Sequence, residues 1–320
     1  MDVFSSLMVH ARPHFFQEAL RAAYQLGLFA ALEEPQAPAR LAASLDLSLA
    51  RLRPLLDVLV LEGALQRAPA GCLSRAEPPP PPPPPGPVAG WGRLAEVLRR
   101  DRPLDPGEGF AGAEEAGARF QRHLREAGGA AADEVAQRLA PAFAAGGVLL
   151  DAGGGVGTYA AALLQQAPAA RAVLVERPAV LALAREEMAA LGALERIELR
   201  EGDLFTDNLG QGHQIVLLCN VLHLYNEVRC AALVERAARS LRCGGEVVVK
   251  DLRVTPERSG SAAGLYFALN MALYTQGGDV HDTDVLRGLL LRAGLREVKE
   301  ERLRSSPDAV LMRGQAPCAP

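Results

Sequence analysis

The sequence has few aromatic residues and no excess of basic ones. Aromatic residues make up 5% of the 320 positions, and 34 Lys and Arg stand against 38 Asp and Glu, for a formal net charge of -4. Without a basic excess or a Lys/Arg-rich run, the chain lacks the electrostatic signature of a nucleic-acid-binding protein. No apolar run is long enough for a membrane span. The first six residues lack the basic start and long apolar core of a secretion signal, which predicts a cytoplasmic protein.

Cysteine is scarce and scattered. The five cysteines are odd in number, widely spaced and in no metal-ligand spacing, so we expect reduced thiols and no bound metal. They are Cys72, Cys219, Cys230, Cys243 and Cys318. About half of the residues are apolar, which is enough for a sizeable core in one large domain or two ordinary ones.

Three short helices and a strand are expected near the N-terminus. Apolar residues at helical spacing predict a helix over 14–33, broken near Gly27, and two more over 38–45 and 48–62, the last capped by Ser48. A strand begins at residue 64, which completes the outline of a winged helix. The second helix carries only Arg40 as a base, which is poor for phosphate contacts. A packing or dimerisation module is therefore favoured over DNA binding.

An unbroken proline run separates this region from the rest. Residues 78–85 are all proline and predict an extended, polyproline-like spacer. A docking site for a proline-recognising domain is the alternative, but no flanking basic or aromatic residues favour it. A short amphipathic helix over 91–100 follows, and 113–145 reads as two helices separated around Gly128 and Gly129.

From residue 147 onwards, strands and helices alternate. This pattern predicts an α/β fold with a doubly wound parallel sheet, closed at one edge by a final hairpin. The expected strands are 148–150, 172–175, 197–199, 215–219, 246–249, 296–303 and 308–313, and the expected helices are 159–166, 179–191, 227–241 and 284–294.

A glycine turn follows the first strand of this region. Asp151 ends the strand, and Gly153, Gly155 and Gly157 alternate after it. This differs from the Gly-x-Gly-x-x-Gly spacing of dinucleotide sites. It is closer to the acidic-x-Gly-x-Gly-x-Gly pattern that suits S-adenosylmethionine, whose ammonium Asp151 is placed to meet. Taken alone, the glycine pattern leaves a dinucleotide open.

Acidic residues follow the next two strands as well. Glu176 is placed to accept hydrogen bonds from the vicinal hydroxyls of a ribose, a feature that dinucleotide sites share. Asp203 can accept from the adenine amino group, with Leu204 and Phe205 against the ring. Each acid alone is more often a solvated surface carboxylate. Three of them at successive strand ends favour an S-adenosylmethionine site.

At this point the chain resembles a known family, the class I S-adenosylmethionine-dependent methyltransferases. Within them it resembles the plant caffeate and acetylserotonin O-methyltransferases and their bacterial natural-product members. The resemblance is carried by residues 23–32, 41–45 and 59–65, which are similar to that family's dimerisation domain, and by 151–157, 175–180, 202–205 and 243–249, which are similar to its cofactor domain. It implies a homodimer, a winged helix that does not bind DNA, and S-adenosylhomocysteine as product.

The resemblance also implies a catalytic base. His223, in the stretch 220–226 after the fourth strand, matches the histidine that deprotonates the acceptor hydroxyl, and Asp251 matches a position that holds an orienting Glu. Asn220 is the neighbouring candidate for the cofactor. A second acid is expected where Val280 stands, and Asp279 or Asp282 would replace it after a loop shift. An acid and an indole that usually follow the histidine are also absent. These departures leave an N-, S- or C-methyltransferase, or a non-methylating relative, as alternatives.

The substrate pocket is expected between the two parts of the chain. Asn270, Met271 and Tyr274 match family pocket positions, and Phe120 and His123 are further candidates. Met271 and Phe120 are equally consistent with core positions at helical spacing, whereas Asn270 in an apolar helix needs a polar partner.

These observations together predict a homodimeric methyltransferase that acts on a small molecule. Two other classes of protein are the alternatives. One is a metabolite-sensing winged-helix regulator that binds DNA, and the other is an NAD-linked oxidoreductase. The expected organisation is a dimerisation domain at 1–77, a proline-rich linker at 78–90, a helical connector at 91–146 and a cofactor domain at 147–320.

Overall fold

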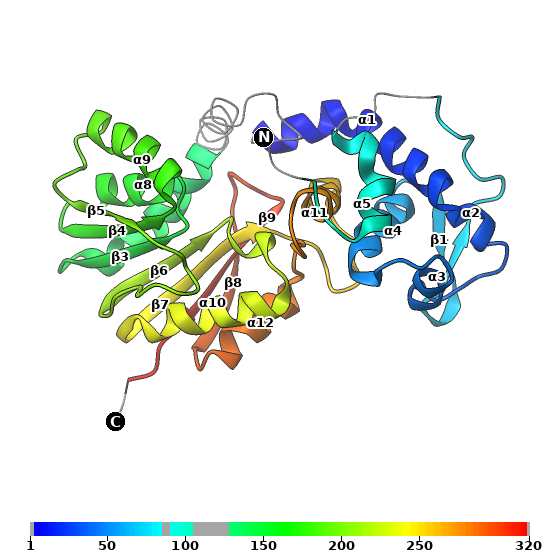
Figure 1. The fold of residues 1–320 in the computed structure, drawn as a ribbon. Helices are drawn as coiled ribbons and strands as arrows, with labels where there is room; N and C mark the ends of the chain where they lie inside the picture. Colours follow the sequence, from blue (N-terminus) through cyan, green and yellow to red (C-terminus); the bar gives the residue numbers. More distant parts are fainter. Residues whose placement is uncertain (1–2, 85–89, 105–127, 319–320) are drawn as a thin grey trace.

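Apolar strands buried on both faces build the central sheet of the computed structural model, which describes residues 3–84, 90–104 and 128–318. The sheet has seven strands in the order β5-β4-β3-β6-β7-β9-β8 (Figure 1). The first five of these pair in parallel, while β9 and β8 form an antiparallel hairpin at the edge. The predicted α/β class and the closing hairpin are confirmed. The strands are β3 (Gly147–Ala152), β4 (Ala170–Glu176), β5 (Ile197–Glu201), β6 (His213–Cys219), β7 (Leu241–Leu252), β8 (Arg296–Arg302) and β9 (Ala309–Gln315).

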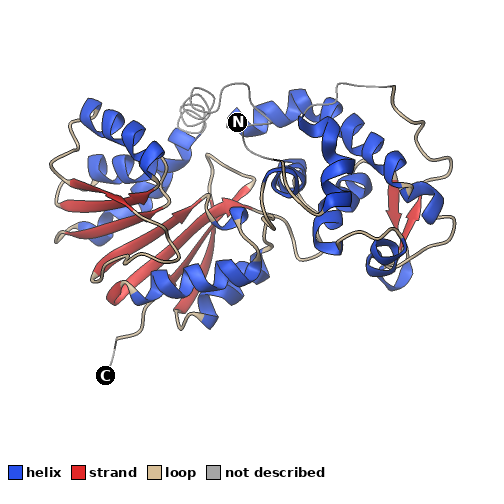
Figure 2. Ribbon diagram, viewed as in Figure 1, coloured by secondary structure: helices blue, strands red, loops and turns tan. Residues whose placement is uncertain are grey.

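Helices cover both faces of this sheet (Figure 2). One face packs against α8 (Thr158–Gln166), α9 (Pro178–Ala190) and the helix of residues 128–139. The other face packs against α10 (Glu227–Arg239) and α12 (Thr283–Arg292). Because both faces are covered, the inner strands β3, β4 and β6 are apolar on both sides, which explains their near-continuous apolar runs, whereas the edge strand β5 carries polar residues.

The N-terminal part is a helical bundle with a small hairpin. Its helices end close to the predicted positions, and Gly27 lies in the left-handed region (φ 78°) where the first helix breaks. Ser48 occupies the N-cap position, but its side chain makes no capping hydrogen bond. The elements are α1 (Val3–Leu26), α2 (Leu28–Ala31), α3 (Pro38–Ser44), α4 (Leu49–Leu61), β1 (Leu65–Arg67), η1 (Pro69–Gly71), β2 (Leu73–Arg75), η2 (Gly90–Arg93) and α5 (Leu94–Arg100), with η3 (Ala140–Phe143) preceding β3.

A helix from the C-terminal half completes the N-terminal core. α11 (Ala262–Tyr274) lies among α1, α4 and α5 in Figure 1 and shares their apolar cluster. Its sequence is apolar on most sides, as expected of a largely enclosed helix, and Asn270 is the exception. Two polar contacts seat it: the Tyr266 hydroxyl donates to Glu62 Oε1 (2.9 Å), and Arg51 Nη1 donates to the Ala272 carbonyl (2.5 Å). The two halves of the sequence are therefore interleaved in space.

The proline run lies against α1. The Tyr24 hydroxyl donates to the Pro80 carbonyl, and Arg21 Nη2 donates to the Pro84 carbonyl (2.7 Å). Proline carbonyls are acceptors without a competing N–H on the same residue, so an extended run offers such contacts readily. The described residues 78–84 have no helix or strand.

Two cysteines are paired, which corrects the expectation of five free thiols. Cys243 and Cys318 form a disulfide, while Cys72, Cys219 and Cys230 are free. The pairing depends on tertiary structure, because the Gly244 N–H donates to the Ala316 carbonyl (3.2 Å) and brings the C-terminal tail beside the start of β7. Within the described ranges, no helix has the length and apolarity needed to cross a bilayer.

An arginine that is largely but not fully buried, Arg258, joins the two halves of the molecule. Arg258 Nε donates to Asp57 on α4 (2.9 Å), and its two terminal nitrogens donate to Asp279 (2.9 and 3.1 Å). Burial raises the pKa of Asp57 even though the Arg258 charge opposes that rise. The positive charge of Arg258 thus compensates two carboxylates, Asp57 and Asp279, that lie together with little access to water.

Replacing Arg258 with methionine is expected to lower the free energy of unfolding by about 3 kcal/mol, because it leaves the buried Asp57 carboxylate with only the longer ion pair to Arg67 (3.6 Å). The loss should be larger at pH 8 than at pH 4. Without the arginine the pKa of Asp57 rises further, so the carboxyl is neutral at low pH and its burial then costs less. Urea unfolding at both pH values measures this, with Arg171→Met at an exposed strand position as the control. Equal losses at the two pH values would contradict the account.

Candidate functional site

The candidate site lies at the carboxyl ends of the parallel strands. Asp151 ends β3, Glu176 ends β4, and His223 and Asp251 lie at the ends of β6 and β7. These strands are neighbours in the sheet, in the order β4-β3-β6-β7. The chain reverses its direction of winding between β3 and β6, which is where open α/β sheets bind ligands.

Asp151 is the most deeply buried acid of the site. It has no exposed surface, and its Oδ2 accepts a hydrogen bond from the Ala160 N–H (3.3 Å). Its Oδ1 is buried without a partner. Burial raises the pKa of Asp151 to about 7, and the nearby Glu176 charge adds to the rise. A carboxylate in this state gains from a cationic partner, because that partner would restore the lost solvation.

The glycine turn is shaped around this carboxylate. Gly153, Gly155 and Gly157 adopt left-handed backbone angles (φ 72°, 60° and 83°) that other residues rarely adopt. Gly154 has ordinary angles, but a Cβ there would overlap the Asp151 carboxyl group and the Leu174 side chain. The turn therefore needs glycine for two separate reasons, one conformational and one steric.

Gly154→Ala is expected to displace the Asp151 carboxylate and to destabilise the protein by about 1–3 kcal/mol, as overpacking does. Gly129→Ala is the matched control, because its Cβ would meet nothing within 4 Å in the helix of residues 128–139. Thermal unfolding of both variants measures the difference. A Gly154→Ala protein as stable as the control would show that the turn is looser than the structure indicates.

Glu176 closes over the glycine turn. Its Oε2 accepts from the Gly155 N–H (3.3 Å), and its Oε1 accepts from the Arg177 N–H (2.8 Å). A carboxylate has about four lone-pair sites, so acceptor capacity remains for further donors. This geometry is compatible with the predicted contact to a ribose diol.

An aromatic group forms the next part of the edge. Asp203 Oδ1 accepts from the Phe205 N–H (2.7 Å), and Leu204 is buried. The Phe205 ring meets Tyr225 edge-on (centroids 4.9 Å apart), and the Arg229 guanidinium lies 3.9 Å above the Phe205 ring centre. The sequence analysis missed Tyr225 and Arg229. Tyr225 precedes α10 in an extended conformation and Arg229 lies in its first turn, so only the folded arrangement brings both against the Phe205 ring.

His223 and Asp251 form a buried pair. His223 lies on η4 (Leu222–Leu224), and its Nδ1 is 2.6 Å from Asp251 Oδ1. Asp251 Oδ2 also accepts from the His223 backbone N–H (3.2 Å). Burial alone would raise the pKa of Asp251, but the His223 ring, Lys250 and further hydrogen bonds hold it below its ordinary value. Asp251 is therefore ionised at neutral pH, so Nδ1 carries the ring proton and Nε2 is left as the basic atom.

Asn220 directly follows β6 in a left-handed conformation (φ 58°). Its backbone N–H donates to the Lys250 carbonyl (2.7 Å), and its side-chain oxygen accepts from Lys250 Nζ (3.0 Å). Asparagine tolerates this conformation better than most residues. Lys250, which the sequence analysis did not single out, is buried beside the His223–Asp251 pair.

Asp279 and Asp282, the two suggested substitutes for the second acid beside His223, both bind other partners instead. Asp279 is paired with Arg258, and the Asp282 side chain caps α12 by accepting from the Val285 N–H (2.8 Å). Val280 is fully buried in the N-terminal apolar cluster. Among the residues that the structure describes, only Asp251 hydrogen-bonds His223 through a carboxylate.

The predicted substrate residues lie on α11 between the two halves. Met271 is buried, while Asn270 and Tyr274 are partly exposed, and burial raises the pKa of Tyr274. Phe267, one turn before Met271, meets the His223 ring edge-on with centroids 4.8 Å apart. α11 therefore connects the N-terminal core directly to His223. Phe120 and His123 lie outside the described residues.

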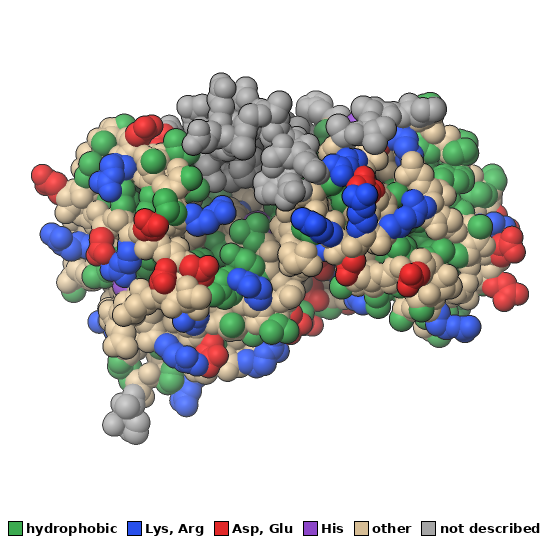
Figure 3. All heavy atoms as spheres, in the orientation of Figure 1, with side chains coloured by type: hydrophobic (Ala, Val, Ile, Leu, Met, Phe, Trp, Pro, Cys, Tyr) green, Lys and Arg blue, Asp and Glu red, His purple; other side chains and the backbone are tan. Residues whose placement is uncertain are grey.

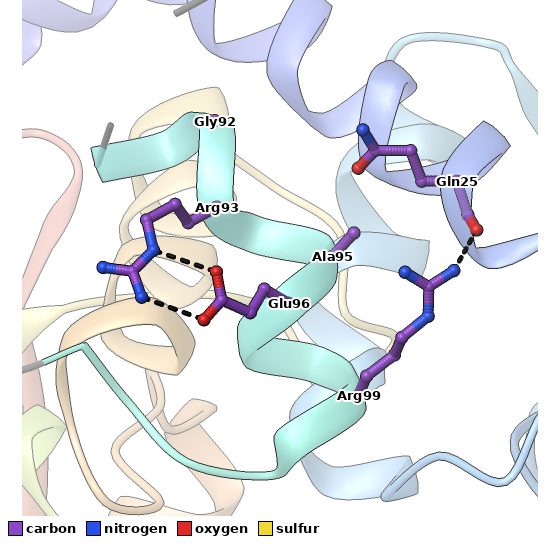
Figure 4. A pocket seen from close by; sticks show the side chains of 6 residues that line it. All are labelled: Gln25, Gly92, Arg93, Ala95, Glu96 and Arg99. Atoms are coloured by element: carbon purple, nitrogen blue, oxygen red, sulfur yellow. Dashed lines mark hydrogen bonds and ion pairs between the residues drawn. The ribbon is translucent and has the colours of Figure 1, made fainter. Parts of the chain in front are cut away.

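A surface pocket of about 390 Å³ lies away from this site, between α1 and α5 (Figure 4). Arg93 and Glu96 form a two-point ion pair at its wall (2.9 and 3.0 Å), and Arg99 donates to the Gln25 carbonyl. Each of these three charged side chains therefore already has a partner within the pocket wall. Acidic and basic side chains also intermingle over the face in Figure 3 rather than gathering by sign. Within the described parts of the chain, no group of three metal-ligating side chains occurs.

Comparison with known proteins identifies similar sequences and folds. The profile of the O-methyltransferase domain matches residues 108–296. The chain is 34% identical over 176 residues to 3-hydroxy-5-methyl-1-naphthoate 3-O-methyltransferase of Streptomyces sahachiroi, covering 53% of this chain and 50% of that one. It is 33% identical over 166 residues to acetylserotonin O-methyltransferase of Bos taurus, covering 52% of this chain and 47% of that one. The matched segment thus spans about half of each curated relative.

The structural comparison extends over nearly the whole chain. The crystal structure of an O-methyltransferase family 2 protein from Planctomyces limnophilus, in complex with apigenin, superposes with a TM-score of 0.81. The two are 26% identical, and the match covers 98% of this chain and 96% of that one. The N-terminal helices and the sheet therefore occur together in a known architecture.

Proposed function

The chain is a member of the O-methyltransferase family, and on that premise we propose that it transfers a methyl group from S-adenosylmethionine to a hydroxyl of a small aromatic molecule. The observation that carries the proposal is the buried His223–Asp251 pair, 2.6 Å apart, at the strand edge that also carries Asp151. This strand edge therefore carries both a histidine whose tautomer is fixed and a carboxylate suited to a cationic ligand.

The residues present fit this cofactor. The unpartnered Oδ1 of buried Asp151 suits the ammonium of the amino acid end, and the free acceptor capacity of Glu176 suits the ribose diol. Asp203, Leu204 and Phe205 would hold the adenine. Gly153, Gly155 and Asn220 would make further contacts with the cofactor. When bound, S-adenosylmethionine supplies an electrophilic methyl group on a sulfonium. No metal is needed for that chemistry.

His223 would act as the general base. Asp251 fixes the proton on Nδ1, so Nε2 can accept the proton of the acceptor hydroxyl as that oxygen becomes a nucleophile. The phenol has a pKa of about 10, so the transfer is favourable only while attack proceeds. Most of the remaining rate would come from holding the acceptor oxygen in line with the methyl group.

The acceptor would bind between α11 and the sheet. Asn270, Met271 and Tyr274 are the proposed lining on α11, with Phe120 and His123 as further candidates. Relatives named for hydroxylated aromatic substrates favour an acceptor of that class, and we propose a role in secondary metabolism. We further propose that the N-terminal part, residues 1–77, forms a homodimer, with 78–90 as linker, 91–146 as connector and 147–320 as cofactor domain.

Titration calorimetry tests the cofactor assignment directly. S-adenosylhomocysteine is expected to bind with one site per chain, and NAD is expected not to bind. Binding of NAD alone would replace the proposal with an oxidoreductase. Light scattering on a sizing column tests the dimer separately, and retarded DNA in a low-salt gel shift would favour the regulator instead.

A further inference from the structure

His223 lies on an element that cannot hold its own position. η4 spans only Leu222–Leu224, and one turn of 3₁₀-helix makes too few hydrogen bonds to be rigid by itself. The Asp251 contacts fix the His223 ring and its backbone N–H. Within the turn, the Leu224 N–H donates to the Val221 carbonyl (3.1 Å) and the Tyr225 N–H donates to the Leu222 carbonyl (3.0 Å), so any further partners come from other segments.

His281 supplies those partners. Its Nε2 lies 2.9 Å from the Tyr225 carbonyl and 3.3 Å from the Leu222 carbonyl, one on each side of His223 in the sequence. Both carbonyls can only accept, so Nε2 carries a proton and donates to them. The Cys230 thiol, 3.3 Å from the same nitrogen, also donates to the Leu222 carbonyl (3.2 Å). One imidazole therefore spans the turn that carries the base.

The segment that carries His281 is itself anchored independently of η4. Val280 is fully buried in the N-terminal apolar cluster, and Asp279 is paired with Arg258. Gly278 packs so closely on the His223 carbonyl that a Cβ there would overlap it. Residues 278–281 are thus held by the N-terminal core and contact η4 at both of its ends.

We propose that His281 is a positioning residue for His223, and this inference rests on the proposed function of His223 as base. His281 keeps η4 at the depth where the His223 ring meets Asp251. Without it, the Tyr225 carbonyl keeps only the longer contact from the Cys230 thiol (3.5 Å), and we expect the C-terminal end of the turn to move. A displacement of about 1 Å at a catalytic group can cost about 100-fold in rate.

The test compares His281→Ala with His281→Gln and with a matched control, His213→Ala. Glutamine can place an amide N–H near the position of Nε2. His213 is buried and its Nε2 lies 2.9 Å from the Leu209 carbonyl, but it starts β6, at the opposite end from η4. His281→Ala loses one short and one longer histidine-to-carbonyl contact, and His213→Ala loses one short contact, so urea unfolding should show losses of stability of similar size.

Two readouts distinguish positioning from general support. In ¹⁵N-histidine-labelled protein, the His223 Nδ1–H bonded to Asp251 should give a far-downfield proton resonance, identified by its absence in His223→Gln. It should shift or disappear in His281→Ala and persist in His281→Gln and His213→Ala. With the best acceptor of a panel of hydroxylated aromatics, kcat should fall about 10- to 100-fold in His281→Ala with little change in KM, and glutamine should restore it.

An unchanged His223 resonance in His281→Ala, or an equal change in His213→Ala, would overturn the inference. Because the resonance needs no acceptor, it decides the role of His281 even if methyl transfer is absent. Conversely, normal turnover of His223→Gln would remove the proposed base while leaving the resonance test of His281 intact.

Discussion

His223→Ala is expected to lower kcat by about 10³-fold, within the range that general bases contribute, while the affinity for S-adenosylhomocysteine stays nearly unchanged. The reason is the division of labour at the strand edge. His223 is hydrogen-bonded to Asp251, whereas the acidic residues proposed for the cofactor lie on β3, on β4 and in the loop after β5. Steady-state kinetics and calorimetry on one preparation measure both quantities.

Asp251→Asn is the informative companion to this variant. It preserves the size of the side chain but removes the charge that fixes the proton on Nδ1, so turnover should also fall by orders of magnitude. His14→Ala, on the exposed surface of α1, is the control. Near-normal turnover of His223→Ala would show that His223 is not the base. The proposed cofactor site would be unaffected by that result.

Asp151→Asn is expected to stabilise the free protein and to weaken cofactor binding at the same time. Burial raises the pKa of Asp151 from 3.8 to about 7, which at about 1.4 kcal/mol per unit amounts to roughly 4 kcal/mol of cost for holding the charge at pH 8. The isosteric amide removes that cost. It also removes the charge that we propose meets the ammonium of S-adenosylmethionine, so the affinity should fall about 100-fold, as for a lost charged hydrogen bond.

The pH dependence has a definite sign. Between pH of about 4 and 7 the folded protein keeps the Asp151 proton and the unfolded chain does not, so this group makes stability fall as pH rises and level off above 7. The asparagine variant lacks this contribution. The affinity for the cofactor should change in the opposite direction. It should increase as the pH rises through 7, because the Asp151 carboxylate ionises.

Thermal unfolding at pH 5 and pH 8, with and without S-adenosylhomocysteine, measures both effects. The gain in stability of Asp151→Asn should be small at pH 5 and large at pH 8. A variant that is destabilised at pH 8 would show that the Asp151 charge is already compensated in the free protein, contrary to its unpartnered oxygen.

The sheet was predictable because its signals are local. Apolar runs such as 148–150 and 215–219 mark buried strands whatever their neighbours, and glycines after β3 mark a turn that needs left-handed angles. Features that depend on distant contacts were not predictable. The placement of α11 in the N-terminal core and the Cys243–Cys318 disulfide both need the folded arrangement.

The site divides in the same way. Strand-end acids such as Asp151 and the His223–Asp251 pairing followed from position along the chain and from family resemblance. Asp279 did not, because its role depends on Arg258, which arrives from a different loop. His281 carried no signal in the sequence beyond its proximity to Gly278, since its contacts are to backbone carbonyls rather than to side chains.

Transfer of a labelled methyl group tests the central claim most directly. The wild-type protein is incubated with S-adenosyl-[methyl-¹³C]methionine and a panel of hydroxylated aromatics, and the products are followed by mass spectrometry and ¹³C NMR. We predict a ¹³C-methyl ether on an acceptor oxygen, one S-adenosylhomocysteine per product, and loss of the product in His223→Ala. A labelled methyl group on nitrogen or carbon, or undiminished ether formation in His223→Ala, would contradict the account.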